Sequence, residues 1–305
     1  MFNPLDHPIC LATPVRIADS AWLSHVPFAL GLMDLLRPRV FVELGAFTGV
    51  SYCAFCQAAS TLQVECRCYA IDTWEGDSHA GFYGQEILQE LREHHDPLYG
   101  SFSRLVQSTF DAALSHFANS SIDLLHIDGF HSYEEAKSDF IKWLPKMSEK
   151  GVVLFHDINV RERDFGLWKL WDEIKSQYPH FSFTHGHGLG ILGVGSEQVQ
   201  PLKMLYGARE PEAIVIREFF HVLGSRVERV AEDRTLGQSL RQSLCEIREL
   251  ESQLEKNRNY IKRLQEIWSV RFLQVWANEG LPGFFGRTLA KLTPKILPPK
   301  YKDWW

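Results

Sequence analysis

The sequence of 305 residues lacks any long hydrophobic run. No stretch approaches the roughly 18 consecutive apolar residues that a membrane-spanning helix needs. The opening residues, MFNPLDHPIC, also lack the basic and apolar regions of a secretion signal. We therefore expect a cytoplasmic protein.

The sequence also lacks an excess of positive charge, and it contains few cysteines. There are 32 Lys and Arg against 38 Asp and Glu, a net charge of -6, which argues against a surface built for nucleic acid. The six cysteines are expected to be reduced thiols rather than a disulfide framework, because no secretion signal is present. With 45% hydrophobic residues the chain can bury a sizeable core, so a mainly disordered protein is excluded.

Short apolar runs that end in polar or acidic residues recur over the first two thirds of the chain. Continuous apolar runs that alternate with helical segments are typical of a parallel sheet covered on both faces. The pattern predicts an open α/β domain that ends near residue 200. The expected strands are 39–45, 67–72, 103–107, 121–128 and 151–157, with helices over 132–147 and 163–178 and a closing strand within 186–195.

The last third of the chain has a different character. Residues 201–280 form the expected helical extension, in which apolar residues step mostly by three or four, as in an amphipathic helix or short coiled coil. Two interpretations stay open: the helix packs back on the domain, or it joins copies of the chain into a homo-oligomer. The residues concerned are Leu240, Leu244, Ile247, Leu250, Leu254, Ile261 and Leu264.

Residues 281–305 mix aromatic and basic residues with four prolines, the first of them Pro282. We expect the prolines to prevent a single helix. This tail is interpreted either as a contact with an anionic membrane surface or as a segment packed on the body.

Two strand ends carry residues suited to a nucleotide-like ligand. Gly45 and Gly49 flank the turn after the first expected strand, where backbone can approach a ligand closely, and Glu43 can accept a hydrogen bond from a ligand amine. Asp72 ends the second strand, where an acidic residue can bind ribose hydroxyls. Trp74 is interpreted either as a cover for an adenine ring or as a packing residue. The glycine pattern differs from GxGxxG, which disfavours NAD.

A second cluster follows the fourth and fifth strands. Asp128 and His131 lie in HIDGFH, and His156 and Asp157 lie in LFHD. Two carboxylates and an imidazole at one edge of the sheet predict a divalent metal site made of Asp128, His156 and Asp157. His131 is the candidate general base, since a neutral imidazole can take a proton from a hydroxyl.

The runs VELGAFTGVSY, AIDTWEGD and IDLLHIDGFHSYEEAKSDFIKWLPKMSEKGVVLFHDI together resemble the class I S-adenosylmethionine-dependent methyltransferases. The subgroup that they resemble most is associated with bacterial glycosyltransferases and related to macrocin-type sugar O-methyltransferases. The resemblance covers about residues 38–195. It implies a Rossmann-like, doubly wound, mostly parallel seven-stranded sheet over residues 1–200.

The resemblance also implies roles for individual residues. Glu43 and Gly45 would contact the methionine part of S-adenosylmethionine, Asp72 would bind its ribose, and Ser108 would lie near the adenine. We also count Gly49, Trp74 and Asp128 among the candidate cofactor-binding residues. Asp128 and Asp157 match the metal-binding acids of the family, and His131 matches its general base. His156 departs from the family's pattern. Because imidazole is a better ligand for Mn than for Mg, this departure affects which metal is expected.

These observations predict an O-methyltransferase, metal-assisted, that acts on a sugar or polysaccharide-precursor hydroxyl. A phenolic acceptor is not excluded. Two alternatives are an iron-dependent, hydroxylase-like enzyme on the same scaffold and a non-catalytic assembly protein.

Overall fold

The computed structural model describes residues 2–77, 81–129, 132–162 and 165–292. The chain divides into two compact units, Met1–Arg234 and Thr235–Trp305. Unit 1 contains the whole sheet and every candidate site residue that the structure describes.

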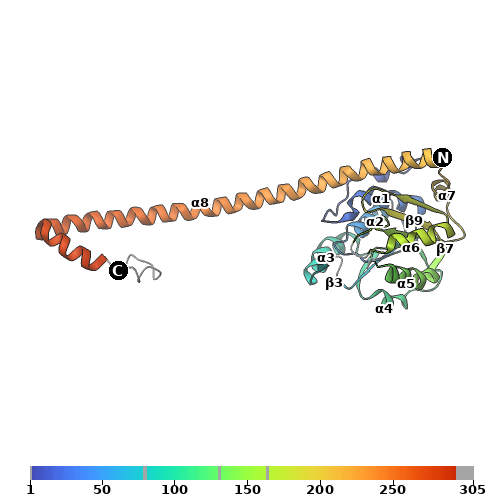
Figure 1. Ribbon diagram of the computed structural model, residues 1–305, viewed down its shortest axis with the longest axis horizontal. Helices are drawn as coiled ribbons and strands as arrows, with labels where there is room; N and C mark the ends of the chain where they lie inside the picture. Colours follow the sequence, from blue (N-terminus) through green and yellow to red (C-terminus); the bar gives the residue numbers. More distant parts are fainter. Residues whose placement is uncertain (1, 78–80, 130–131, 163–164, 293–305) are drawn as a thin grey trace. The chain divides into compact units, whose positions relative to one another are not determined.

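Unit 1 is built on a seven-stranded sheet with the order β5-β2-β1-β6-β7-β9-β8 (Figure 1). The pairs that join β5, β2, β1, β6 and β7 are parallel, whereas β9 runs antiparallel to both of its neighbours. The predicted fold class, a Rossmann-like and mostly parallel seven-stranded sheet, is therefore confirmed. The strands are β1 Val40–Leu44, β2 Arg67–Asp72, β5 Ser103–Gln107, β6 Ile122–Ile127, β7 Met147–His156, β8 His180–Phe183 and β9 Leu189–Gly193, and a separate small hairpin pairs β3 Gly76–Asp77 with β4 Gly81–Phe82.

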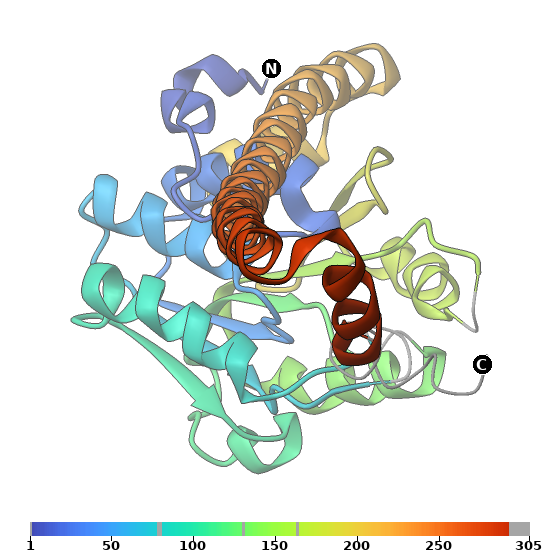
Figure 2. The same ribbon diagram turned by 90° about the vertical axis from the view of Figure 1, so that its left-hand side faces the viewer.

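Helices cover both faces of this sheet (Figure 2). Successive side chains of a strand point to opposite faces, so Phe41 of β1 joins one apolar cluster and Val42 joins the other. Both faces are buried, which explains why the strands read as continuous apolar runs. The helices are α1 Val26–Leu36, α2 Val50–Thr61, α3 Gln85–Tyr99, α4 Phe110–Leu114, α5 Tyr133–Trp143, α6 Leu167–Ile174, α7 Gln200–Tyr206 and α8 Glu210–Leu292.

Local sequence accounts for the start of α5. Ser132 has extended backbone, and its hydroxyl accepts a hydrogen bond from the Glu135 N–H, as expected of an N-cap residue. Glu134 and Glu135 place negative charge at the positive end of the helix dipole. The helix that the sequence predicts over 132–147 is thus confirmed, with a short 3₁₀ turn at its end.

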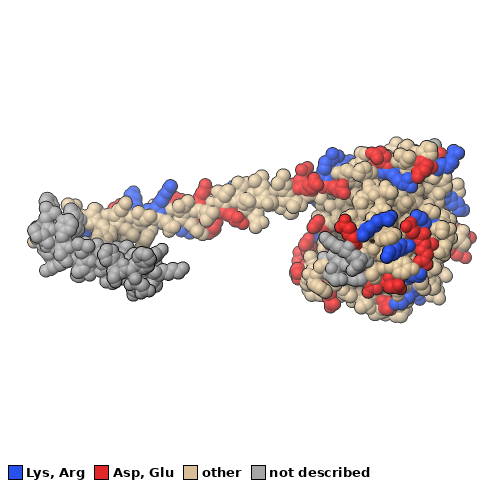
Figure 3. Space-filling view, in the orientation of Figure 1, with Lys and Arg blue, Asp and Glu red and all other residues tan. Residues whose placement is uncertain are grey.

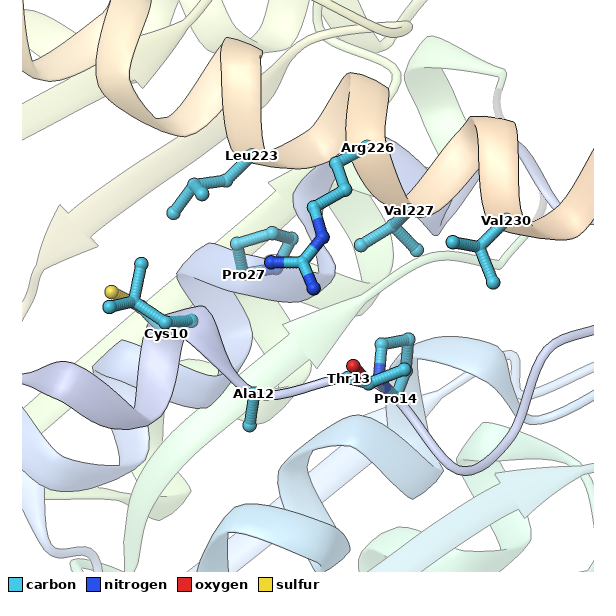
Figure 4. A pocket seen from close by; sticks show the side chains of 10 residues that line it. Cys10, Ala12, Thr13, Pro14, Pro27, Leu223, Arg226, Val227 and Val230 are labelled. Atoms are coloured by element: carbon cyan, nitrogen blue, oxygen red, sulfur yellow. The ribbon is translucent and has the colours of Figure 1, made fainter.

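Unit 1 extends past residue 200, where the sequence analysis expects the domain to end. Leu202 and Leu205 of α7 and Phe220 and Val227 of α8 are buried in the same apolar cluster as α1. Between α8 and the N-terminal segment lies a small pocket, into which Arg226 points (Figure 4). The first part of α8 therefore belongs to the domain.

Unit 2 begins within α8. From Leu236 to Leu273 the helix leaves most of its described large apolar side chains exposed. The helix also runs through Pro282 to Leu292, so Pro282 does not end it, and the expectation that residues 281–305 are not a single helix stays a prediction. Residues 293–305 of the expected tail lie outside the described residues, and their contact with a membrane stays a prediction. In the described part of the chain, every helix is too short or too polar to cross a bilayer.

Candidate active site

The carboxyl ends of the parallel strands bring four acidic residues to one edge of the sheet. Glu43 lies in β1 and Asp72 at the end of β2, while Asp128 and Asp157 follow β6 and β7 directly. These strands are parallel neighbours in the sheet, so their ends lie side by side. Ligand sites of open α/β sheets lie outside this edge.

Glu43 is fully buried and is held by protein groups on both of its oxygens. Its Oε1 accepts a hydrogen bond from Ser51 at 2.7 Å, and its Oε2 lies 2.9 Å from His126 Nδ1. The indole N–H of Trp22 donates to His126 Nε2 at 3.1 Å. An indole can only donate, so Nδ1 carries the ring proton and donates to Glu43. Burial raises the pKa of Glu43, although His126 opposes the shift.

The turn after β1 packs directly on the end of β6. Gly45 has φ +87, and a Cβ atom added to it would lie 2.2 Å from the Asp128 carbonyl oxygen. Only glycine fits this combination of left-handed backbone and close approach. Gly49, at φ +76, precedes α2, and there a Cβ would meet the side chain of Leu91. The two glycines thus allow the tight turn that the sequence predicts.

Asp72 holds this turn in place. Its Oδ2 accepts hydrogen bonds from the N–H groups of Ala46 and Phe47 at 2.8 and 2.9 Å, and its Oδ1 accepts one from the Trp74 N–H at 2.8 Å. Carboxylate bonds to backbone N–H are among the stronger hydrogen bonds in proteins. Asp72 therefore fixes the backbone of the β1–α2 turn, a role that the sequence analysis did not assign.

Two further predicted cofactor residues, Trp74 and Ser108, lie beside the β2 end. The side chain of Trp74 is fully buried, and its indole N–H donates to the Phe47 carbonyl at 3.0 Å. Of its two interpretations, the structure shows packing. Ser108 follows β5, and its N–H donates to the Asp72 carbonyl at 2.9 Å, so it lies beside the β2 end. The expected base, His131, lies outside the described residues.

The second cluster is brought together as predicted. His156 Nδ1 lies 3.3 Å from an oxygen of Asp128 and 3.3 Å from an oxygen of Asp157. His156 and Asp157 are buried, whereas the side chain of Asp128 is 17% exposed. His187, from the segment between β8 and β9, lies 2.9 Å from Asp157 and borders the cluster on its solvent side. The cluster is therefore open to solvent at Asp128 and His187.

The charges of His156 and the nearby carboxylates shift one another's pKa values. Burial lowers the pKa of His156, but Asp128 and Asp157 outweigh burial and raise it to about 10. Burial likewise raises the pKa of Asp128, and His156 outweighs that effect so that the net shift is downward. Without a cation, an imidazolium therefore balances part of the charge of the two carboxylates.

The same three residues can hold a metal ion. One ligand atom from each of Asp128, His156 and Asp157 can be chosen so that all three lie within 4.8 Å of one another. Two carboxylate oxygens and one imidazole nitrogen suit Mn²⁺ or Fe²⁺ better than Mg²⁺. His156 must lose its proton to bind the ion, so metal and proton compete for this site.

Several residues of this edge were missed from the sequence. His126 and Ser51 bond Glu43, Trp22 bonds His126, and His187 reaches Asp157 from the segment between β8 and β9. His126 lies two residues before Asp128, inside an apolar run, and a histidine in a buried strand could have signalled a paired carboxylate. The others are far away in the sequence and carry no such signal.

Part of the segment between β2 and β5 is built into the domain. Residues 85–99 form α3, in which His95 is buried and lies 2.7 Å from the Ser103 hydroxyl. Helix α3 therefore packs as part of the core.

Comparison with known proteins bears on this edge. Residues 42–158 match a family model described as a methyltransferase domain. This segment is therefore similar to methyltransferase domains. It runs from β1 to the residues after β7 and contains every predicted site residue, which supports the methyltransferase prediction.

A relative with a similar sequence matches only part of this chain and a small part of its own length. The chain is 48% identical over 186 residues to the uncharacterized protein y4gI of Sinorhizobium fredii, which covers 61% of this chain and 20% of that protein. The chain thus spans about a fifth of the length of this relative.

Two solved structures have a similar shape at low identity. A putative caffeoyl-CoA O-methyltransferase from Staphylococcus aureus is 15% identical, over 58% of this chain and 84% of that one, with a TM-score of 0.43. The O-methyltransferase TomG from Streptomyces achromogenes is 12% identical, over 59% and 92%, with a TM-score of 0.42. Similarity this weak says nothing about the activity of this chain.

Proposed function

We propose that the chain is an S-adenosylmethionine-dependent O-methyltransferase that acts on a sugar or polysaccharide-precursor hydroxyl. One observation carries the proposal: the segment that matches a methyltransferase domain places the turn held by Asp72 and the Asp128–His156–Asp157 cluster at one edge of the sheet. A methyl donor and an activated hydroxyl need such adjacent sites.

The cofactor side of the site is the β1–α2 turn. Asp72 fixes the backbone of Ala46 and Phe47, and Gly45 lets the turn lie against β6. Each carboxylate oxygen has two lone pairs, so Asp72 keeps acceptor capacity for a ribose hydroxyl while it holds the turn. Glu43 lies in β1 just before the turn, and its two oxygens bond Ser51 of α2 and His126 of β6. These bonds link the elements on both sides of the turn.

The acceptor side is the cluster around Asp128. A sugar hydroxyl is a weak nucleophile, so its oxygen must lose its proton as the methyl group moves from the sulfonium sulfur to oxygen. Asp128 is the member of the cluster with an exposed edge, and it can accept a hydrogen bond from the hydroxyl. His131, two residues past the end of the described segment at 129, is proposed to receive the proton.

Asp128, His156 and Asp157 would hold a divalent cation, which when bound would supply Lewis acidity to the acceptor oxygen. His187 would orient Asp157 through their 2.9 Å contact. Without a cation, the imidazolium of His156 lowers the pKa of Asp128 and lies 3.3 Å from an oxygen of each carboxylate.

Calorimetric titration of S-adenosylmethionine into the purified chain tests the cofactor assignment. We expect binding that weakens at least about tenfold in Asp72→Ala, because the turn loses three hydrogen bonds. Asp172→Asn, on the exposed part of α6, is the control and should bind as the wild type does. Lack of binding by the wild type, together with iron-dependent oxygen consumption, would favour the hydroxylase alternative. Lack of both would favour the assembly protein.

Methyl transfer to a panel of sugars and phenols, with and without Mn²⁺, tests the acceptor and the metal. Asp157→Asn and His131→Gln are expected to keep cofactor binding and lose transfer. Transfer only to phenols would contradict the sugar assignment, and equal transfer with a chelator would contradict metal assistance.

A further inference from the structure

Unit 2 exposes a regular apolar stripe along α8. The stripe repeats with heptad spacing, the signature of a helix that pairs with another helix. Its first heptad position holds Leu240, Ile247, Leu254, Ile261 and Trp268, and its fourth holds Leu236, Ser243, Leu250, Asn257, Leu264 and Arg271. We call these residues the seam.

The seam has no cover within the described chain. Seven of its apolar side chains are between 39% and 70% exposed, from Trp268 to Leu236. A row this long is unusual on the surface of a monomeric protein. A single helix without tertiary packing is also marginal in water, so this stretch of α8 needs a partner.

We infer that the seam pairs with the seam of a second copy of the chain, as an antiparallel two-stranded coiled coil. When the seam is aligned with a second, antiparallel seam, apolar residues of one fall opposite apolar residues of the other, and this points to a second copy as the partner. With Leu254 level with Asn257 of the second copy, Ile247 lies opposite Leu264 of the second copy. Ile261 likewise lies opposite Leu250 of the second copy, so apolar layers form on both sides of the centre.

Side-chain size supports the antiparallel direction. In this register Trp268 lies opposite Ser243 of the second copy, so the largest seam residue meets the smallest one. A parallel pair in register would instead place Trp268 against Trp268, Ser243 against Ser243 and Arg271 against Arg271 of the second copy. Large against small packs without voids, whereas the parallel pairing leaves a gap at one layer and repels at another.

Charge beside the seam favours the same direction. In the antiparallel register Glu251 lies near Arg258 of the second copy, twice in the dimer by symmetry. A parallel pair in register would place Glu246 near Glu251 of the second copy, also twice. Acidic and basic side chains along this stretch of α8 are visible in Figure 3. Like charges at such flanking positions disfavour a pairing.

A native probe can report the direction. Cys245 is exposed, whereas the other five cysteines are buried and will react slowly. In the antiparallel dimer, Cys245 lies level with position 266 of the second copy, so two spin labels are about 32 Å apart along the axis at 1.5 Å per residue. A parallel dimer in register would place both labels at the same level along the axis, so only the width of the helix pair would separate them.

Two measurements on the full-length chain test the proposal. Analytical ultracentrifugation should find a dimer for the wild type and for Ser252→Asp, which adds charge on the far side of the helix, and a monomer for Leu254→Asp. Pulsed electron resonance on labelled Cys245 should find a distance above about 30 Å. A monomeric wild type, or a short label distance, would overturn the proposal.

Charge reversal at Glu251 distinguishes the two directions independently, because it should weaken one dimer and tighten the other. Glu251→Arg should weaken the antiparallel dimer about fivefold, and the added substitution Arg258→Glu should restore it. In a parallel dimer, Glu251→Arg would instead remove the repulsion with Glu246 of the second copy and tighten the dimer. The methyltransferase assignment does not enter either test, so the two proposals can fail separately.

Discussion

The two parts of α8 have the same apolar spacing and opposite surroundings. In the part within unit 1, Ala213, Ile216 and Phe220 step by three or four and are buried against the domain. In the part within unit 2, Ile247, Leu250 and Leu254 step in the same way, yet they are exposed. The spacing shows that a helix face requires cover, but it does not show what provides the cover.

The largest effect is expected from Phe220→Ala. Phe220 is 2% exposed, and its ring packs on Phe28 and Phe183 at 5.3 and 5.5 Å. Truncation should lower the free energy of unfolding of unit 1 by about 3–5 kcal/mol, because a cavity remains. Chemical denaturation followed by the tryptophan fluorescence of the domain measures this. Leu236→Ala, in the exposed part of the helix, should leave this transition unchanged.

Gly224→Ala tests the same boundary through the backbone. A Cβ atom at Gly224 would lie 2.2 Å from the Ser24 carbonyl oxygen, so the helix must move away from the segment before α1. Helix propensity favours alanine, but the collision should outweigh it and cost about 2 kcal/mol or more. Thermal unfolding of unit 1 is the measurement. Unchanged stability would mean that α8 is not held against Ser24 in solution.

Sequence analysis predicted the framework well and the connections at its edge poorly. Strands such as β1 and β6 were recognised because both of their faces are buried, which makes each a continuous apolar run. The cluster of Asp128, His156 and Asp157 was recognised because parallel strands end at one edge. The extent of the domain was underestimated, since burial of Phe220 depends on tertiary contacts that no local pattern encodes.

Residue roles at the site were harder to predict than residue positions. Asp72 is predicted to bind a ribose, and the structure adds three backbone hydrogen bonds that it accepts from its own chain. Glu43 is predicted to bind a ligand amine, and the structure adds the bonds of its oxygens to Ser51 and His126. An acidic residue at a strand end is a signal for a polar site, but its partners come from segments that the fold brings together.

The pH dependence of unit 1 is the next smaller effect. Burial, with His221 of α8 nearby, lowers the pKa of His185 from 6.5 to about 4, and burial and His156 lower that of His25 as well. Unfolded histidines take up protons below about pH 6.5 while the folded ones stay neutral. Stability should therefore be unaffected above pH 6.5 and fall as the pH drops towards 4.

Urea unfolding at pH 7.5 and pH 5 measures this dependence. His185→Gln should reduce the loss of stability between the two pH values, because one buried neutral imidazole is removed. His116→Gln, at an exposed position, is the matched control and should keep the wild-type loss. An equal loss in the two variants would show that His185 is not buried neutral beside α8.

The smallest effect is expected from Gly237→Ala, where the comparison of the two parts of α8 is sharpest. Gly237 lies in the same helix as Gly224, but no atom lies within 4 Å of a Cβ added there. Alanine should therefore stabilise the helix by about 0.5–1 kcal/mol through its higher helix propensity. Hydrogen exchange of the amides around position 237 should slow by roughly threefold, while exchange in the sheet stays unchanged. Because the same substitution should stabilise one part of the helix and destabilise the other, the sign of the effect locates where the domain ends.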